Sequence, residues 1–262
     1  MNSEKADYFQ ITEHPGLKAT KEQVERIYHR YHFARKFAKG KDVLEVACGS
    51  GIGLGYLQEV ANSVTGGDID EKNIEIARKY YKDRIKVEIM DAHSLPFPEN
   101  SFDLVLLYEA IYYLKEPQSF IKEASRVLRD EGVLIICTVN KDWEDFHPSP
   151  YTYNYFSVPE LYEALKNEFR EIEMYGAFKV EYKGMKDKVV SLIKRLAVNF
   201  NLIPGSLSAR AYLKRIFMGK LLPIPEELKE GMCEYYEPVP ISLHKKCEEF
   251  KIIYAVAKKG GN

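Results

Sequence analysis

The pattern of apolar positions changes its period near residue 40. Residues 21–39 carry apolar side chains at helical spacing, among them Val24, Ile27 and Ala34, which predicts an amphipathic helix. Gly40 is a typical residue to end such a helix. Beyond it, short apolar runs alternate with amphipathic stretches. The runs that predict buried strands are residues 42–47, 63–69, 84–90, 102–108 and 132–139. The stretches that predict helices are residues 54–61, 73–82 and 120–128.

This alternation over residues 42–139 predicts the fold class. Parallel neighbours need a crossover connection, and right-handed crossovers place helices on both faces of the sheet. The chain is therefore expected to be an α/β protein with a doubly wound, mostly parallel sheet. In such sheets ligands bind beyond the carboxyl ends of the strands. Functional residues should then directly follow the apolar runs.

The alternation loosens after residue 140. Residues 158–169 predict a further helix, and residues 171–178 and 252–259 predict the last two strands. Between those strands the chain has a mostly helical texture, with basic amphipathic stretches at 186–200 and 206–219. A long excursion between two strands is usually functional or interfacial.

We therefore expect three parts in the chain. Residues 1–40 form an N-terminal helical lid. Residues 41–180 together with 251–262 form the core, and residues 181–250 form a helical insertion that caps the ligand-binding side.

Composition and charge exclude several classes of protein. The net charge of −1 gives no global reason to expect a nucleic-acid partner. No apolar run reaches the roughly 18 residues that a membrane-spanning helix requires. The polar N-terminus lacks the apolar segment of a secretory signal, so a cytoplasmic location is expected. The four cysteines are scattered, which favours reduced, buried thiols.

The strongest local motif is VLEVACGSGIG at residues 43–53. A predicted strand runs into Gly49, Gly51 and Gly53, which let the chain turn sharply and bring bare backbone against a ligand. Glu45 lies in the strand, four residues before the first glycine. A dinucleotide fingerprint would place a glycine at the sixth position, where this chain has Leu54.

Two acids follow the next two strands. Asp68 ends the second strand, 19 residues after Gly49, where a carboxylate can accept hydrogen bonds from ribose hydroxyls. Asp91 follows the third strand, where it can accept a bond from the exocyclic amine of adenine. Ile69 and Ala92 would flank the ring. The alternative role for both acids is to cap a helix N-terminus.

These motifs together resemble the class I methyltransferases that act on small molecules. The resemblance covers roughly residues 28–140. It is carried by four segments: VLEVACGSGIG, VTGGDID, MDAHSLPFPENSFDLVLLYEAIYYL and RVLRDEGVLIICTVN. It implies a Rossmann-like seven-stranded sheet whose last strand is antiparallel, and S-adenosylmethionine as the cofactor. The residues that match the family's cofactor site are Glu45, Ala47, Gly49, Gly51, Asp68, Ile69, Asp91, Ala92 and Tyr108.

Methyl transfer asks little of side chains beyond holding the acceptor in line with the methyl group. A general base is needed only if the acceptor must lose a proton. The candidate catalytic residues are His147, in the aromatic loop 142–156, and Glu109, which follows the fourth strand. The alternative histidines are His29, His32 and His93.

The residues after the fourth strand can be compared with those of metal-dependent relatives. The resemblance extends to ubiquinone-pathway O-methyltransferases, which have Glu-x-x-Glu-His here as a proposed divalent-metal site. This chain keeps Glu109 but has Tyr112 and Tyr113 in place of the other two ligands. One carboxylate alone is a poor metal site, so no metal is predicted.

The sequence indicates the chemical class of the methyl acceptor but not its identity. Residues 183–220 hold nine Lys or Arg against one acid, Asp187, which suits an anionic acceptor, a peripheral contact with a membrane, or a merely solvated helix face. PYTYNYFSVPEL (150–161) and LKRIFMGKL (213–221) resemble methyltransferases of sugar and polysaccharide pathways. A small-molecule acceptor is therefore expected, such as a sugar or a lipid-linked or nucleotide-linked intermediate.

Other functions and the oligomeric state stay open at this point. The alternatives are an NAD-binding enzyme of the same fold and a non-catalytic module that binds S-adenosylmethionine. A nucleic-acid amino-methyltransferase would carry an Asn/Asp-Pro-Pro-aromatic tetrad after the fourth strand, where YEAIYY stands instead.

Overall fold

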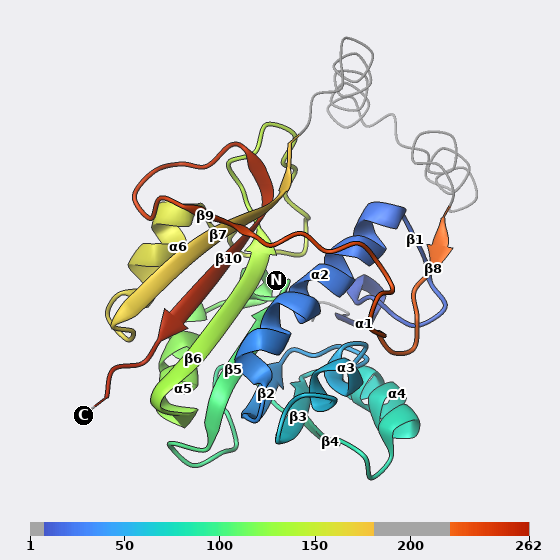
Figure 1. Cartoon of the computed structure of the whole chain (residues 1–262). Coiled ribbons are helices and arrows are strands. Elements are labelled where there is room, and N and C mark those ends of the chain that lie inside the picture. The colour runs from blue at the N-terminus through green and yellow to red at the C-terminus, as the bar shows by residue number, and fades with distance from the viewer. Residues whose placement is uncertain (1–7, 181–220, 262) are drawn as a thin grey trace, which may run out of the picture.

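Eight strands form the central sheet of the computed structural model, which describes residues 8–180 and 221–261 (Figure 1). In spatial order they are β4 (Lys86–Ile89), β3 (Ser63–Asp68), β2 (Asp42–Val46), β5 (Phe102–Tyr108), β6 (Leu128–Val139), β10 (Phe250–Lys258), β7 (Glu171–Lys179) and β9 (Val239–Ile241). The first five are mutually parallel, whereas β10 runs antiparallel to both β6 and β7. The predicted mostly parallel sheet with an antiparallel last strand is confirmed.

Strand β9 brings the central sheet to eight strands, where seven were predicted. Val239–Ile241 pairs with β7 at the edge of the sheet, with Pro240 opposite Tyr175. Proline cannot donate a ladder hydrogen bond, so it is tolerated on an edge strand and not in the middle of a sheet. The proline-rich sequence here gave no strand signal, which is why seven strands were expected.

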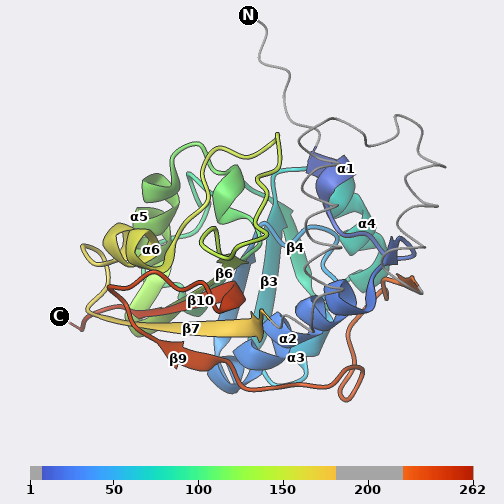
Figure 2. The same ribbon diagram turned by 90° about the horizontal axis from the view of Figure 1, so that it is seen from above.

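Helices cover both faces of the sheet (Figures 1 and 2). On one face lie α2 (Lys21–Ala38), α3 (Leu54–Gln58) and α4 (Glu71–Tyr81), and on the other lie α5 (Pro117–Val127) and α6 (Val158–Leu165). Each face buries its own apolar core. Among the described residues, no helix combines the length and the apolar character that crossing a bilayer would require.

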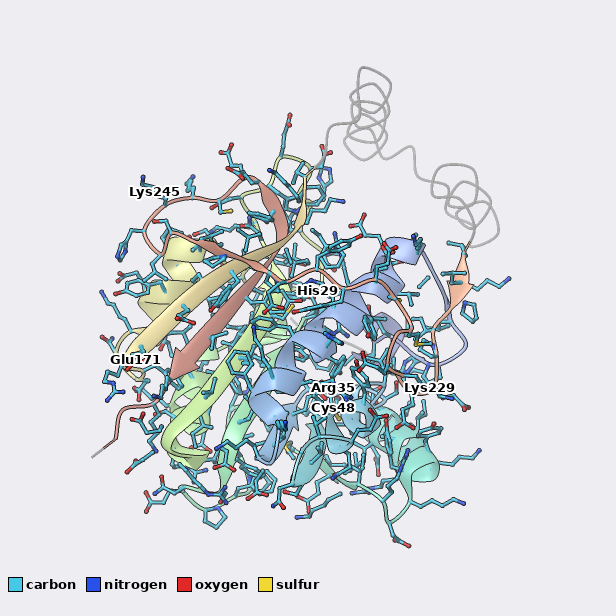
Figure 3. The ribbon with its side chains drawn as sticks, in the orientation of Figure 1. His29, Arg35, Cys48, Glu171, Lys229 and Lys245 are labelled. Atoms are coloured by element: carbon cyan, nitrogen blue, oxygen red, sulfur yellow. The ribbon has the colours of Figure 1, made fainter. Side chains whose placement is uncertain are left out.

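Helix α2 begins at a capping box. Thr20 Oγ1 accepts a hydrogen bond from the Gln23 amide, and Gln23 Oε1 accepts one from the Thr20 amide. Further along, His29 lies where α2 packs against β10 (Figure 3). Its ring bridges the Tyr254 hydroxyl at 2.8 Å and the Tyr236 carbonyl at 2.7 Å. Burial lowers the pKa of His29 to about 4, so the ring packs as the neutral form.

Residues 224–238 form a strap over α2, and the longer stretch 221–249 contains no helix. The described part of this stretch contains β8 (Leu222–Pro223), which pairs with β1 (Lys18–Ala19), then turns, then β9. The helical prediction is wrong for these residues, because four prolines (223, 225, 238 and 240) interrupt them. The basic amphipathic stretches predicted within 181–220 lie outside the described residues.

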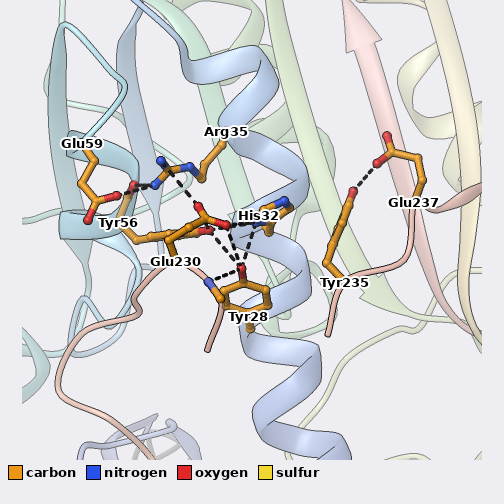
Figure 4. Close-up of polar contacts among 9 residues, drawn as sticks. Tyr28, His32, Arg35, Tyr56, Glu59, Glu230, Tyr235 and Glu237 are labelled. Carbon is orange, nitrogen blue, oxygen red and sulfur yellow. Dashed lines mark hydrogen bonds and ion pairs between the residues drawn. The ribbon is translucent and has the colours of Figure 1, made fainter. Parts of the chain in front are cut away.

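Polar contacts fasten this strap to the outer face of α2 (Figure 4). Glu230 accepts hydrogen bonds from Tyr56 at 2.8 Å and from Tyr28 at 3.3 Å. On the same face Arg35 donates to Glu59 at 2.7 Å, while His32 bonds Tyr56 at 2.8 Å. The strap thus ties α2 to α3, on the side of α2 that faces away from the carboxyl ends of the strands.

Candidate active site

A cavity of about 280 Å³ lies at the carboxyl ends of β2, β3 and β5. Helix α1 (Tyr8–Ile11) and the chain that follows it also contribute to its wall. Eight of the nine predicted cofactor residues line the cavity: Glu45, Ala47, Gly49, Asp68, Ile69, Asp91, Ala92 and Tyr108. Gly51 is not in the lining. The motifs that are separated in sequence therefore meet at one place, as the topology requires.

The glycine loop combines a tight turn with close packing. Ala47, Gly49 and Gly51 all have positive φ, at 56°, 57° and 79°, a region that favours glycine. A Cβ at Gly49 would lie only 2.8 Å from the Thr12 side chain. Gly51 points away from the cavity, and its carbonyl accepts a 2.7 Å hydrogen bond from the Tyr81 hydroxyl. Its role in this structure is to shape the turn.

Asp68, the last residue of β3, is buried against the glycine loop. Its carboxylate accepts hydrogen bonds from the Gly49 amide at 2.9 Å, the Asp70 amide at 2.8 Å and the Asn73 side chain at 3.3 Å. Burial raises the pKa of Asp68, against these three bonds. An ionised carboxylate offers about four lone-pair positions, so capacity remains for a ligand hydroxyl. The residue that caps α4 is Asp70, not Asp68.

Asp91 and Ile69 are arranged differently, at the open edge of the cavity. Asp91 Oδ1 accepts two hydrogen bonds from His93, from the amide at 2.9 Å and from the ring at 2.7 Å. Although partial burial opposes the effect, these bonds lower the pKa of Asp91 and keep it ionised. Ile69 is 50% exposed beside it, while Ala92 is buried. An exposed isoleucine next to a carboxylate suits a flat ring that carries an amine.

Glu45 supplies a direct test of whether a polar cofactor fits. It is 1% exposed, and its Oε1 accepts a 2.5 Å hydrogen bond from the Tyr31 hydroxyl. Burial raises the pKa of Glu45 to about 7. Its Oε2 and the Tyr108 hydroxyl are both buried without a hydrogen-bond partner, although buried polar atoms are almost always paired. The residues around this part of the cavity therefore fit a ligand that brings donor groups or positive charge.

Glu109 lies at the other end of the cavity. It directly follows β5 with a φ of 50°, a strained conformation for a residue other than glycine. Its Oε2 accepts a 2.8 Å hydrogen bond from Tyr112, whose ring stacks on Tyr155 at 4.6 Å. Burial raises the pKa of Glu109, against the attraction of the Arg30 guanidinium. A largely buried carboxyl with a raised pKa is a suitable proton acceptor.

The structure does not bring His147 to this cavity. The side chain is exposed and absent from the lining. The loop 142–156 turns Phe146 inward against Tyr155, with ring centroids 4.7 Å apart, and leaves His147 and Pro148 on the outside. Of the alternative histidines, only His93 lines the cavity.

Sequence analysis missed a second group of lining residues. Gln23, Arg26 and Arg30 of α2 face the cavity, as do Thr12 and Glu13 from the N-terminal segment. The three α2 positions are spaced by three and four residues, so they form one stripe on the helix. The spacing is present in the sequence, but the apolar stripe of the same helix predicts only its buried face.

No group of three or more His, Cys, Asp or Glu side chains that could hold a metal ion occurs in residues 8–180 and 221–261. The prediction that no metal takes part stays a prediction.

The strand order, the glycine loop after β2 and the acids at the ends of β3 and β4 are typical of Rossmann-like proteins that bind a nucleotide cofactor. Comparison with known families then separates the possible cofactors. Residues 44–136 match the family model described as "Methyltransferase domain". A possible histamine N-methyltransferase of Thermotoga maritima has the same fold, with a TM-score of 0.55 over 91% of this chain and 97% of that one, at 17% identity.

Two curated relatives agree with this assignment. A probable S-adenosylmethionine-dependent methyltransferase of Mycolicibacterium smegmatis is 33% identical over 138 residues, or 51% of this chain and 53% of the relative. A fatty-acid O-methyltransferase of the same organism is 29% identical over 217 residues, or 80% of this chain and 70% of the relative. The chain thus spans about half the length of the first relative. Residues 44–136 thus carry a methyltransferase domain, and the chain is similar to class I S-adenosylmethionine-dependent methyltransferases, which favours S-adenosylmethionine over NAD as the cofactor.

Proposed function

We propose that this chain transfers a methyl group from S-adenosylmethionine to a hydroxyl oxygen of a lipid acceptor, with Glu109 as the general base. The observation that carries the proposal is one continuous cavity that joins Asp68 and Asp91 at one end to Glu109 at the other. This placement supports a cofactor and an acceptor that meet inside the same cavity.

Specific residues would hold the cofactor. Asp68 would accept hydrogen bonds from the ribose, and Asp91 would accept one from the adenine amine. Glu45 Oε2 and the Tyr108 hydroxyl, both without partners, would face the methionine portion. When bound, the cofactor supplies a methyl group on a positively charged sulfur. Closing Tyr8 and Thr12 over the site would exclude water from it.

The residues around Glu109 suit an acceptor that carries a hydroxyl group. The acceptor hydroxyl would give its proton to the Glu109 carboxylate, and its oxygen would take the methyl group as the sulfur–methyl bond breaks, which leaves S-adenosylhomocysteine. Tyr112 donates to the same carboxylate and holds its orientation. The aromatic rings of Tyr8 and Tyr113, 6.1 Å apart in an edge-to-face contact, offer apolar surface for a hydrocarbon chain. The fatty-acid O-methyltransferase relative favours a lipid, whereas the sugar acceptor rests partly on residues outside the described ranges and stays a prediction.

The first experiment tests the cofactor. Calorimetric titration with S-adenosylmethionine should give micromolar binding to the wild-type protein. An Asp68→Ala variant should bind about 10- to 100-fold more weakly, because a charge-assisted hydrogen bond is lost. Asp70→Ala is the matched control, since Asp70 caps α4 and does not line the cavity. Absence of S-adenosylmethionine binding to the folded wild-type protein would refute the proposed function.

The second experiment tests the base and the acceptor class. Hydroxylated fatty acids and long-chain alcohols would be incubated with the cofactor, and the products identified by mass. Glu109→Gln should lower kcat about 100-fold or more and abolish the acidic limb of the pH profile. Glu116→Gln, at an exposed position beyond the cavity, is the control. Full activity of Glu109→Gln would remove Glu109 as the base, and absence of product from every hydroxylated lipid would refute the acceptor class.

A further inference from the structure

Helix α2 lines the acceptor end of the cavity with two arginines that the proposed reaction does not use. Arg26 and Arg30 lie one turn apart on the stripe that starts at Gln23. Both guanidinium groups attract the ionised form of Glu109 and so oppose the rise of its pKa, which requires them to lie close to the proposed base. The following inference rests on the proposed function and names a feature of its acceptor.

Each of these arginines has a hydrogen-bond donor without a partner. The Arg30 side chain is only 10% exposed, and one of its terminal nitrogens donates to Glu13 at 2.6 Å. Arg26 similarly donates to Glu22 at 2.5 Å. In both residues, however, Nε is buried and has no hydrogen-bond partner. Leaving a buried charged donor unpaired is costly, so two such donors on one cavity wall indicate that a ligand oxygen completes them.

The charges around the stripe limit what this ligand can be. Glu13 pairs with Arg30, while Glu22 is shared between Arg26 and Lys251. Glu109 is the remaining carboxyl near the two guanidiniums. Among the described residues, these three carboxyl groups roughly balance Arg26, Arg30 and Lys251, and what is missing is a hydrogen-bond acceptor. Guanidinium groups bind planar oxygen groups best, because their fork of donors matches that geometry.

We propose that Arg26 and Arg30 recognise a carboxyl or carbonyl oxygen of the acceptor, so that the acceptor is a hydroxy-acyl compound. Its hydroxyl lies at Glu109 and is methylated, and its acyl oxygen lies on the arginine stripe. Arg26 and Arg30 are then specificity-determining residues. The carboxylate of the cofactor's methionine portion is the other source of the same chemistry, and the experiment below separates the two.

Two probes of equal length test the idea. One is a β-hydroxy fatty acid of about twelve carbons, and the other is the secondary alcohol that lacks the carboxyl group. Product formation would be measured by mass, and binding by calorimetry in the presence of S-adenosylhomocysteine. The variants are Arg26→Met and Arg26→Lys. Arg35→Met is the matched control, because Arg35 lies on the opposite face of α2 against Tyr56 and Glu59 (Figure 4).

The wild-type protein should prefer the hydroxy acid by about 10- to 100-fold in kcat/KM, the value of one charge-assisted hydrogen bond. Arg26→Met should remove most of that preference, Arg26→Lys should restore part of it, and Arg35→Met should leave it unchanged. The affinity of Arg26→Met for S-adenosylmethionine should equal that of the wild type, which also shows that the variant is folded.

Three results would overturn the inference. The first is a wild-type protein that methylates the alcohol as well as the hydroxy acid, which would leave the proposed function intact. The second is an Arg26→Met variant that keeps the preference. The third is an Arg26→Met variant that binds S-adenosylmethionine more weakly but binds methylthioadenosine, which lacks the amino-acid portion, as the wild type does. If neither probe binds or reacts while the cofactor binds, the acceptor class fails together with this inference.

Discussion

Glu45 should make the stability of the protein depend on pH in an unusual direction. Most carboxylates stabilise a fold as they ionise, but this one is 1% exposed and has a pKa raised by burial to about 7. In the unfolded chain the pKa of a glutamate is near 4.5. The folded state therefore holds the proton more tightly, and the contribution of Glu45 is fully present below about pH 4.5 and is lost as the pH rises through about 7. A pKa difference of this size corresponds to about 3 kcal/mol at most.

Glu45→Gln isolates this effect. Glutamine keeps the size of the side chain and an acceptor for the Tyr31 hydroxyl, but it cannot ionise. Urea unfolding followed by circular dichroism, at intervals from pH 4.5 to 8.5, gives the free energy of unfolding of both proteins. The difference between variant and wild type should move in favour of the variant by about 3 kcal/mol across this range. A difference that stays constant with pH would refute the buried, proton-holding Glu45.

Three further predictions follow from other parts of the structure. His29→Gln should reduce the loss of stability between pH 6.5 and about 4, because the depressed pKa of His29 makes its contribution disappear as the pH falls through that range. Acid unfolding curves measure this loss, and a variant that loses as much stability as the wild type would show that His29 is solvated. Gly53→Ala should lower the unfolding free energy by about 2 kcal/mol, because a Cβ would lie 2.0 Å from the Tyr31 ring, whereas Gly260→Ala, with its nearest atom at 3.8 Å, should change thermal stability little. His147→Ala should keep the wild-type kcat, and a loss of more than tenfold would place this exposed residue in the reaction after all.

Much of the fold could be predicted because its signals are local. The apolar runs that became β2, β3 and β5 are short, and each reaches a glycine or an acid within three residues of its end, so their period identifies them without tertiary information. Strand β9 could not be found in this way. Its two prolines favour a loop, and it becomes a strand only because β7 offers an edge to pair with.

The cofactor end of the site could also be predicted from local signals, since each acid lies at or just after the end of a strand. Gly51 shows the limit of that approach, because position in a motif does not tell which way a turn points its carbonyl. The acceptor end was harder to predict. Arg26 and Arg30 reach the cavity only through the way α2 packs across the strand ends, and His147 belonged to the correct loop but to its outer side.

Strand β10 has a consequence for how the protein is made. It lies between β6 and β7, pairing with both, although some seventy residues separate it from β7 in the chain. During synthesis β6 and β7 therefore cannot be joined until residues 250–258 have left the ribosome, and each presents an open strand edge until then. Such edges can pair with other chains, so this interval is when a nascent chain would most need a chaperone. A premature stop codon before residue 250 should accordingly yield aggregated protein, and not a smaller soluble enzyme.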